Sequence, residues 1–257
     1  MHGIDRGHLV CYNVYGEFQN KVLYQNTFAD EEKRSKFLKK CIHKFDFCPN
    51  DINTILQVID LKNFPGSSKE LRQALNLLQK NYPEFVAKQV FINVPWWYLA
   101  FVRMISPSLS RRIKSKFVFA GPSISAETLI KYIAPEQVPA QYGGMNRDGE
   151  EEFTIVDVVT DVTIKHIIEF PITNKSNLVW ELRVVGWDVK YGAEFMPTAE
   201  DGYAVIMSET RKVSSADETV ISGSFQTSKP GKVVLTIYNQ TFKKKLLYRS
   251  KTKAYSY

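Results

Sequence analysis

One carboxylate stands where α/β enzymes often place a catalytic acid. Asp60 directly follows the mostly apolar run 54–59, which is predicted to be a strand of an α/β sheet. The surrounding sequence, Asp-Leu-Lys-Asn, is more typical of a turn in which the aspartate accepts hydrogen bonds from the backbone. We therefore interpret Asp60 as a turn residue rather than as a catalytic acid.

Other catalytic and metal-binding patterns are missing from the sequence. None of the histidines has a cysteine or carboxylate neighbour at the spacing of metal ligands: His2, His8, His43 and His166. There is no glycine-rich phosphate loop, no G-x-S-x-G elbow, no H-E-x-x-H and no kinase signature. The sequence predicts a protein that is not an enzyme and that needs neither a metal ion nor a cofactor.

The segment Trp96–Ile105 is apolar on every side, with Arg103 as its one charge. A helix of this kind is unstable in water, so it must be buried, contact lipid or cover an apolar cavity. It is too short to cross a bilayer, which needs about 20 such residues. The segment therefore predicts either a core helix or a lid over an apolar cavity.

Cations follow this segment within a dozen residues: Arg111, Arg112, Lys114 and Lys116. Cations beside an apolar surface are typical of proteins that dock on anionic membranes, although an ordinary solvated turn would look the same. A second group, Lys243, Lys244 and Lys245, would contribute about 1 kcal/mol per cation near such a surface. The net charge of +7 fits an anionic membrane surface as partner, and we do not expect nucleic acid.

Composition and cysteine usage indicate a globular cytosolic chain. Of the 257 residues, 44% are hydrophobic and 24% charged, as in folded proteins. Cys11, Cys41 and Cys48 form no C-x-x-C pair, which suits a reducing compartment. The first residues have no apolar core of a signal peptide, so we expect neither secretion nor a membrane anchor. The predicted location is the cytoplasm, with peripheral association to membranes.

The first half of the chain alternates strand and helix patterns. Apolar runs predict strands, and segments with apolar residues at helical spacing predict helices. The predicted strands are 9–15, 54–59, 89–93 and 117–120, and the predicted helices are 30–45, 67–82, 96–105 and 126–132. Residues 111–116 are predicted to be a basic turn. This alternation predicts an open α/β sheet.

The second half shows the two-residue period of strands, with no helical stretch between them. The predicted strands are 153–159, 162–169, 178–189, 203–207, 220–225, 232–238 and 246–248. Short strands separated by turn signals predict a β-sandwich. A glycine- and charge-rich linker is predicted at 141–152. The chain is therefore predicted to have an α/β domain at 1–145 and an all-β domain at 146–257.

Several segments together resemble a known family. LLQKNYPEFVAKQVFINVPWWY, KSKFVFAGPS and PEQVPAQYGG resemble the CRAL-TRIO lipid-binding domain of phosphatidylinositol/phosphatidylcholine-transfer proteins. HLVCYNVYGEFQN and TILQVIDLKNFPG fit the same domain, and LVWELRVVGWDVKYGAEF with KKKLLYR resembles a GOLD domain. This order of domains is similar to that of the plant patellins.

The resemblance implies a cytosolic carrier that holds one phospholipid in an α/β cavity, with no other cofactor. The family's gate helix would correspond to Trp96–Ile105, with cavity residues Trp96, Trp97, Leu99, Phe101, Val102 and Ile105. Its headgroup residues would correspond to Glu84 and Lys116. Lys116 would pair with the phosphate, and Glu84 would accept hydrogen bonds from inositol hydroxyls or orient a cation. A surface ion pair is the alternative for these two residues.

The sequence also departs from the family pattern. Phe85 stands where relatives that bind phosphatidylinositol carry arginine. Ile55 and Gln57 stand where members that exchange phosphatidylcholine carry serine and threonine, so we do not expect a phosphocholine site. The chain starts almost at the first strand, so the family's N-terminal helical part is expected to be missing.

Three functions compete. The first is a non-catalytic phosphoinositide- or phospholipid-binding carrier or peripheral membrane adaptor in membrane trafficking, for which the resemblance implies a role in cell-plate formation and cytokinesis. The second is a scaffold in which the GOLD domain recruits protein partners and the first domain is a degenerate lipid fold. The third, a lipase-like enzyme, lacks a nucleophile–base pair. We expect the first.

Overall fold

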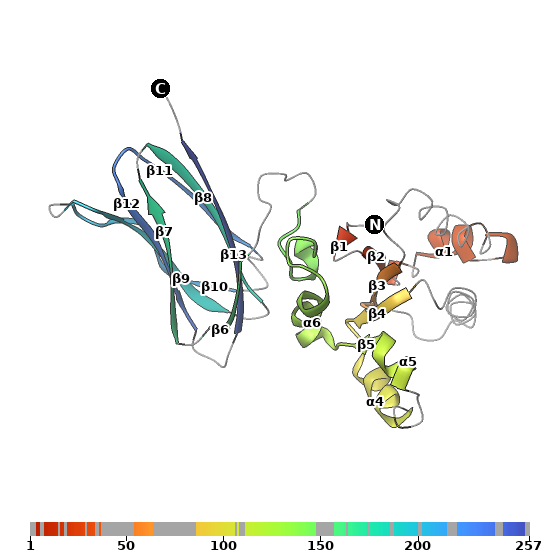
Figure 1. Ribbon diagram of the computed structural model, residues 1–257. Coiled ribbons are helices and arrows are strands. Elements are labelled where there is room, and N and C mark those ends of the chain that lie inside the picture. Colours follow the sequence, from red (N-terminus) through yellow and green to blue (C-terminus); the bar gives the residue numbers. More distant parts are fainter. Residues whose placement is uncertain are drawn as a thin grey trace. The chain divides into compact units, whose positions relative to one another are not determined.

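The chain forms two compact units, Met1–Ser125 and Ala126–Tyr257. Figure 1 shows the computed structural model, in which the order of an α/β fold followed by an all-β fold is confirmed. The structure describes residues 4–5, 8–14, 16–17, 20–28, 30–33, 36, 54–63, 86–105, 107, 111–147, 157–162, 164–173, 175–185, 188–199, 202–214, 220–239 and 244–254.

The first unit is built on a five-stranded sheet. Its order is β1-β2-β3-β4-β5, in which β1 is antiparallel to β2 and the other pairs are parallel. The strands are β1 (Ile4–Asp5), β2 (His8–Val14), β3 (Thr54–Asp60), β4 (Val86–Ile92) and β5 (Phe117–Phe119). Val10, Val58 and Val90 are fully buried in neighbouring strands. Near-continuous apolar runs of this kind form parallel strands that are covered on both faces.

The described helices of this unit are α1 (Lys21–Phe28), α4 (Trp96–Ile105) and α5 (Arg111–Lys116). Asn20 caps α1, because its Oδ1 accepts hydrogen bonds from the backbone N–H groups of Val22 and Leu23. In Figure 1, α4 and α5 lie beside β5. Most of the predicted helix 30–45 and all of 67–82 lie outside the described residues.

The second unit contains a sandwich of two antiparallel four-stranded sheets. One sheet has the order β10-β9-β12-β7 and the other β11-β8-β13-β6 (Figure 1). The strands are β6 (Asp157–Val162), β7 (Lys165–Ile172), β8 (Ser176–Val184), β9 (Val189–Pro197), β10 (Val205–Val213), β11 (Ile221–Thr227), β12 (Gly231–Tyr238) and β13 (Lys244–Ala254).

Alternate residues of these strands fill the space between the two sheets. Leu178, Leu182, Leu235 and Leu246 are among the fully buried members of this core. Trp180 of β8 donates a hydrogen bond from Nε1 to the hydroxyl of Tyr191 in β9, 3.0 Å away, which joins one sheet to the other. Burial of the tryptophan therefore leaves its one polar atom satisfied.

A third layer covers the outer face of the sheet β11-β8-β13-β6. It consists of α6 (Ser125–Tyr132) and the segment that follows it, as far as Arg147. Ile130 and Met145 of this layer pack on Val185, Val220 and Leu247 of the sandwich. Met145 and Leu247 are fully buried, so this segment belongs to the packed structure of the second unit.

The sequence predicts most strands, but some local features differ in the structure. The strands β1 and β9 are not among the predicted ones, since the predicted strand 178–189 ends at the first residue of β9. Residues 111–116 form the helix α5 instead of a turn. The predicted linker 141–152 is wrong for residues 141–147, because Met145 is buried and the backbone there is hydrogen-bonded to Arg183. The remainder of the predicted linker lies outside the described residues.

Replacing Gly223 by alanine is expected to destabilise the sandwich. The new Cβ would lie 2.3 Å from Cζ2 of Trp180, which is held by its hydrogen bond to Tyr191. Overpacking of this kind typically costs about 1–3 kcal/mol. Urea unfolding followed by tryptophan fluorescence should give a lower midpoint for G223A, whereas Ser224→Ala, at an exposed position of the same strand, should leave it unchanged. Equal midpoints would contradict this packing.

Candidate functional site

The corner between β4 and α4 is fixed by a set of polar contacts. The backbone of Asn93 has a φ of 52°, a left-handed conformation that asparagine tolerates. Its N–H donates to Oγ of Ser125 at 2.9 Å, and its side-chain Nδ2 donates to Oδ1 of Asp60 at 2.8 Å. The same Asp60 oxygen accepts from the N–H of Lys62. The interpretation of Asp60 as a turn residue is confirmed.

The helix α4 begins immediately after this corner. Pro95 precedes it, and the Pro95 carbonyl accepts hydrogen bonds from the N–H groups of Tyr98 and Leu99. Proline is favourable at a helix start because its ring fixes φ and no N–H partner is needed there. The corner and the proline together determine the direction in which α4 leaves the sheet.

The inner side of α4 rests on an aromatic face of the sheet. Tyr98 and Leu99 pack on a cluster from three strands and their ends, whose members are Ile59, Leu61, Phe91, Val94, Phe117 and Phe119. The rings of Phe91 and Phe119 stack with their centroids 4.8 Å apart, and Tyr98 lies 6.1 Å from Phe119. These side chains therefore form an apolar floor under the helix.

The outer side of α4 is apolar as well, but it is in contact with water. Trp96 is 80% exposed, Met104 71% and Trp97 45%. The sequence left a core helix and a lid as alternatives; among the described side chains of α4, Tyr98 and Leu99 pack on the sheet, whereas Trp96, Trp97 and Met104 are exposed. The backbone of α4 includes the predicted cavity residues Phe101, Val102 and Ile105, whose side chains lie outside the described part.

Two amide side chains interrupt the apolar floor. Gln57 and Gln89 are paired across β3 and β4, and Gln89 is next to Phe117 in the register of β5. Nε2 of Gln89 donates to Oε1 of Gln57 at 2.8 Å, which leaves the buried Oε1 of Gln89 without a hydrogen-bond partner. A buried polar atom of this kind is costly and can accept from a hydroxyl group of a ligand.

The predicted basic residues of the first unit lie on α5. Arg111 and Lys114 are exposed, and the side chain of Arg112 lies outside the described part. Lys116 is the last residue of α5, is half-buried and directly precedes Phe117 of the aromatic floor. Glu84 lies outside the described residues, so its place beside Lys116 stays a prediction.

The second predicted basic group lies in the second unit. Lys243 lies outside the described residues, and Lys244 begins β13 with an undescribed side chain. Lys245 is half-buried in the same strand. Contact of these lysines with a membrane remains a prediction.

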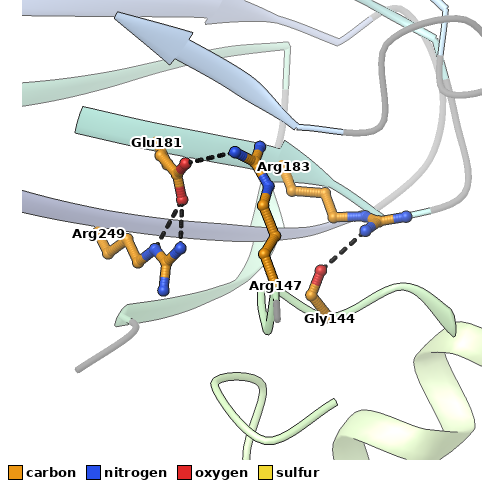
Figure 2. A network of polar contacts seen from close by, with 5 residues as sticks. All are labelled: Gly144, Arg147, Glu181, Arg183 and Arg249. Atoms are coloured by element: carbon orange, nitrogen blue, oxygen red, sulfur yellow. Dashed lines mark hydrogen bonds and ion pairs between the residues drawn. The ribbon is translucent and has the colours of Figure 1, made fainter. Parts of the chain in front are cut away.

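A polar network that was not singled out from the sequence lies under the third layer of the second unit (Figure 2). Glu181 of β8 is 4% exposed and Arg249 of β13 is 3% exposed. Both Nε and a terminal nitrogen of Arg249 donate to Oε2 of Glu181, at 2.7 and 2.5 Å. Arg147 lies 3.0 Å from the other carboxylate oxygen. One buried carboxylate therefore bridges two strands and the covering segment.

Arg183 of β8 completes this network by binding backbone oxygens. Its NH1 donates to the carbonyls of Ala140 and Gly144, at 2.5 and 2.8 Å. Burial, together with the positive charge of Arg147, lowers the pKa of Arg183 to about 10, so it stays charged at neutral pH. Each charge is directed at a protein group, which makes this network a structural clamp rather than a reaction centre.

Metal clusters and membrane-spanning helices are both absent from the described part of the chain. No group of three or more histidine, cysteine, aspartate or glutamate side chains there could hold a metal ion. Among the described helices, none combines the length and apolar character needed to cross a membrane.

Comparison with known proteins gives matches to both halves of the chain. Residues 1–144 match the CRAL/TRIO domain, and residues 162–245 match the Patellin-1-like, C-terminal GOLD domain. Patellin-5 of Arabidopsis thaliana is 55% identical over 98% of this chain. The chain belongs to the patellin family. The family and the fold predicted from the sequence are confirmed.

This patellin chain spans about half the length of the curated relatives it matches. It covers 41% of Patellin-5 and 56% of Patellin-3 of Arabidopsis thaliana, the second of which is 53% identical over 98% of this chain. The phosphatidylinositol transfer protein PDR17 of Saccharomyces cerevisiae is 33% identical over 38% of this chain and 29% of its own length.

The match to the CRAL/TRIO domain extends beyond the first compact unit. The compact units divide after Ser125, whereas the match continues to residue 144. Residues 126–144 thus match the first domain in sequence but pack in the second unit. The domain boundary predicted at residues 145/146 stays a prediction.

Replacing Glu181 by alanine is expected to lower the free energy of unfolding of the second unit by about 3–5 kcal/mol, because Arg249 would stay buried without this carboxylate. Urea unfolding measures the change. Glu209→Ala, at an exposed position of β10, serves as the control.

The double variant E181L/R249M should recover much of the stability lost in E181A, because an apolar pair of similar volume removes both buried charges. If E181A unfolds like E209A, the clamp does not stabilise this unit.

Proposed function

We propose that this patellin is a non-catalytic carrier that holds one phospholipid under α4 and exchanges it at membrane surfaces. The observation that carries the proposal is the position of α4: Tyr98 and Leu99 rest on the aromatic face of the sheet, whereas the apolar side chains of Trp96, Trp97 and Met104 are exposed. A closed helix of this kind covers acyl chains, and an opened one presents its apolar residues to a bilayer. The relative in yeast named as a phosphatidylinositol transfer protein supports the same class of ligand.

The exposed tryptophans give α4 a second task. Trp96 and Trp97 have large rings with one polar N–H each, and such rings favour the boundary between headgroups and acyl chains. The exposed cations Arg103, Arg111 and Lys114 follow on α4 and α5 and would meet anionic headgroups. The carrier would therefore dock with the same helix that covers its lipid.

Phosphoinositides are the favoured ligands within this proposal. Lys116 is half-buried beside the aromatic floor, where an ammonium group would bind a phosphate more strongly than in water. Glu84 would bind the inositol hydroxyls. A cytoplasmic location, peripheral membrane association and a role in membrane trafficking, including cell-plate formation, belong to the same proposal and follow from the resemblance of the sequence to the patellins.

Mass spectrometry of lipid that co-purifies with the full chain tests this function. A carrier is expected to yield about one phospholipid per chain after expression in a eukaryotic host, because the proposed apolar site would lose packing contacts if it stayed unfilled. A chain that yields no lipid but retains protein partners on an affinity column would instead support the scaffold function, in which the GOLD domain recruits partners.

Replacing Lys116 by alanine should weaken extraction of phosphatidylinositol from vesicles about ten- to a hundredfold, the effect of losing one hydrogen bond to a charged group. A fluorescent phosphatidylinositol transfer assay measures this change. Lys131→Ala removes the same charge from an exposed position of α6 and should have little effect. Extraction that is unchanged in K116A would refute the headgroup role of Lys116 but not the binding of lipid.

A further inference from the structure

The outer face of the sheet β10-β9-β12-β7 presents a row of lysines. Lys165 of β7 is paired with Tyr238 of β12, Tyr238 with Lys190 of β9, and Lys190 with Lys212 of β10. Paired residues of antiparallel strands point to the same face. Ile237, Tyr191 and Val213 directly neighbour Tyr238, Lys190 and Lys212 along their strands and fill the core. Ile168, three residues along β7 from Lys165, fills it too, so the row itself faces outward.

Like charges directly opposite each other destabilise a sheet, and this row places Lys190 opposite Lys212. Lys212 is 71% exposed and pairs with Asp188 at 3.0 Å, while the ammonium of Lys165 lies 5.7 Å from the centre of the Tyr238 ring. Lys190 is exposed, and no ion pair joins it to another residue in the part of the chain that the structure describes. Three cations and one carboxylate therefore occupy a line about 14 Å wide, the span of four neighbouring strands.

Two carboxylates described on this face, Glu169 of β7 and Glu194 of β9, are too distant to neutralise the row. Glu169 and Glu194 lie on either side of Val234, their common partner in β12. Each is four residues along its strand from the lysine of the row, which corresponds to about 13 Å. This separation exceeds the screening length of about 8 Å at physiological salt. Glu169 is in addition engaged by Lys232 at 2.8 Å. The row thus acts as a separate positive surface.

Apolar side chains border the same row. Ile164 directly precedes Lys165, and its side chain is 80% exposed. Its carbonyl accepts a hydrogen bond from the N–H of Asn239 at 3.0 Å, so the turn is fixed beside Tyr238. Ile167, on the outer face next to Lys165 along β7, is 46% exposed. Exposed isoleucines beside a line of lysines combine the two properties of a surface that binds anionic bilayers.

We propose that the row Lys165–Tyr238–Lys190–Lys212, with Ile164 and Ile167, docks the GOLD domain on an anionic lipid bilayer. The lysines lie among the headgroups, and Ile164, at its turn, enters the boundary with the acyl chains. This docking depends on the proposed function in one respect, namely that the chain binds to membrane surfaces. It uses no residue of α4 or of the lipid site in the first unit.

Sedimentation of the full chain with vesicles tests the docking surface. The probes are vesicles of phosphatidylcholine alone and vesicles in which about a third of the lipid is phosphatidylserine. Each lysine contributes about fivefold in partitioning, so the triple variant K165Q/K190Q/K212Q should bind the anionic vesicles on the order of a hundredfold more weakly. The control triple K229Q/K232Q/K253Q removes the same charge from other positions of this domain and should lose far less. Equal losses in the two triples would overturn the proposal.

A second pair of variants tests the apolar part. Ile164→Gln should weaken binding about tenfold, and the loss should persist at high salt, because it removes burial of an apolar side chain. Ile206→Gln changes a residue of 67% exposure on β10, away from the row, and should bind like the natural chain. If I164Q and I206Q bind alike, Ile164 does not enter the bilayer and the docking is overturned.

Two additional measurements separate the possible failures. Circular dichroism should show that all variants are folded. The triple variant K165Q/K190Q/K212Q should keep the same amount of co-purified lipid as the natural chain. If neither the variant nor the natural chain contains lipid, the proposed carrier function is contradicted, but the result on docking still holds. Binding to immobilised polyglutamate without any binding to anionic vesicles would assign the row to an acidic protein and overturn the proposal.

Discussion

The contact between α4 and the aromatic face of the parallel sheet is the constraint on which the proposed lipid chemistry depends. Tyr98 and Leu99 bury one side of the helix, and Gly121 allows this approach, because a Cβ at that position would lie 3.3 Å from Leu99 Cδ1. The other side keeps Trp96 and Met104 in water, at a cost that a purely structural helix would avoid. A helix of this composition is stable in two places, against the sheet and in a bilayer, and a carrier that loads and unloads lipid needs both.

The second unit is held together by a different combination of interactions, apolar in its core and ionic on one outer face. Its sandwich core is closed by apolar side chains and by the hydrogen bond between Trp180 and Tyr191, while the outer face of one sheet is closed by a segment held through charges. Glu181 and Arg249 would be expensive to bury singly, and together they fix the position of that segment. A buried ion pair adds little net stability over an apolar pair but specifies one arrangement. The register of the covering segment is thus determined by charge as well as by Met145.

Much of this architecture was predictable because it is local in sequence. The bounds of α4 follow from one apolar run between two prolines, and β3 follows from the run before Asp60. The strand β9 was missed because Gly192 and Glu194 interrupt its apolar residues and only a short connection separates it from β8. The clamp could not be predicted, because Glu181 and Arg249 are 68 residues apart and charged residues in strands are usually solvated. Only the pairing of β8 with β13 brings them together.

The lysine row illustrates the same limit on sequence reasoning. Lys165, Lys190 and Lys212 are spread over 48 positions of the sequence and each looks like an ordinary surface residue. They form a row only because of the register in which β7, β12, β9 and β10 pair. The compact cluster Lys243–Lys245 is conspicuous in the sequence, yet Lys245 is half-buried in β13. Contiguity along the chain is therefore a poor guide to where positive potential accumulates on a sandwich.

The packing of residues 126–147 on the sandwich has a consequence for how members of this family could exchange parts. Recombination at the end of the sequence match, near residue 144, would combine one parent's residues 126–144 with the other parent's Leu247 and Arg183, which contact them. In such hybrids the covering segment and the outer face of the sheet β11-β8-β13-β6 would come from different parents, and their side chains would pack poorly. Recombination that preserves folding, in evolution or in the laboratory, should instead occur upstream of Ala126. The helix α6 and the sandwich would then be inherited together.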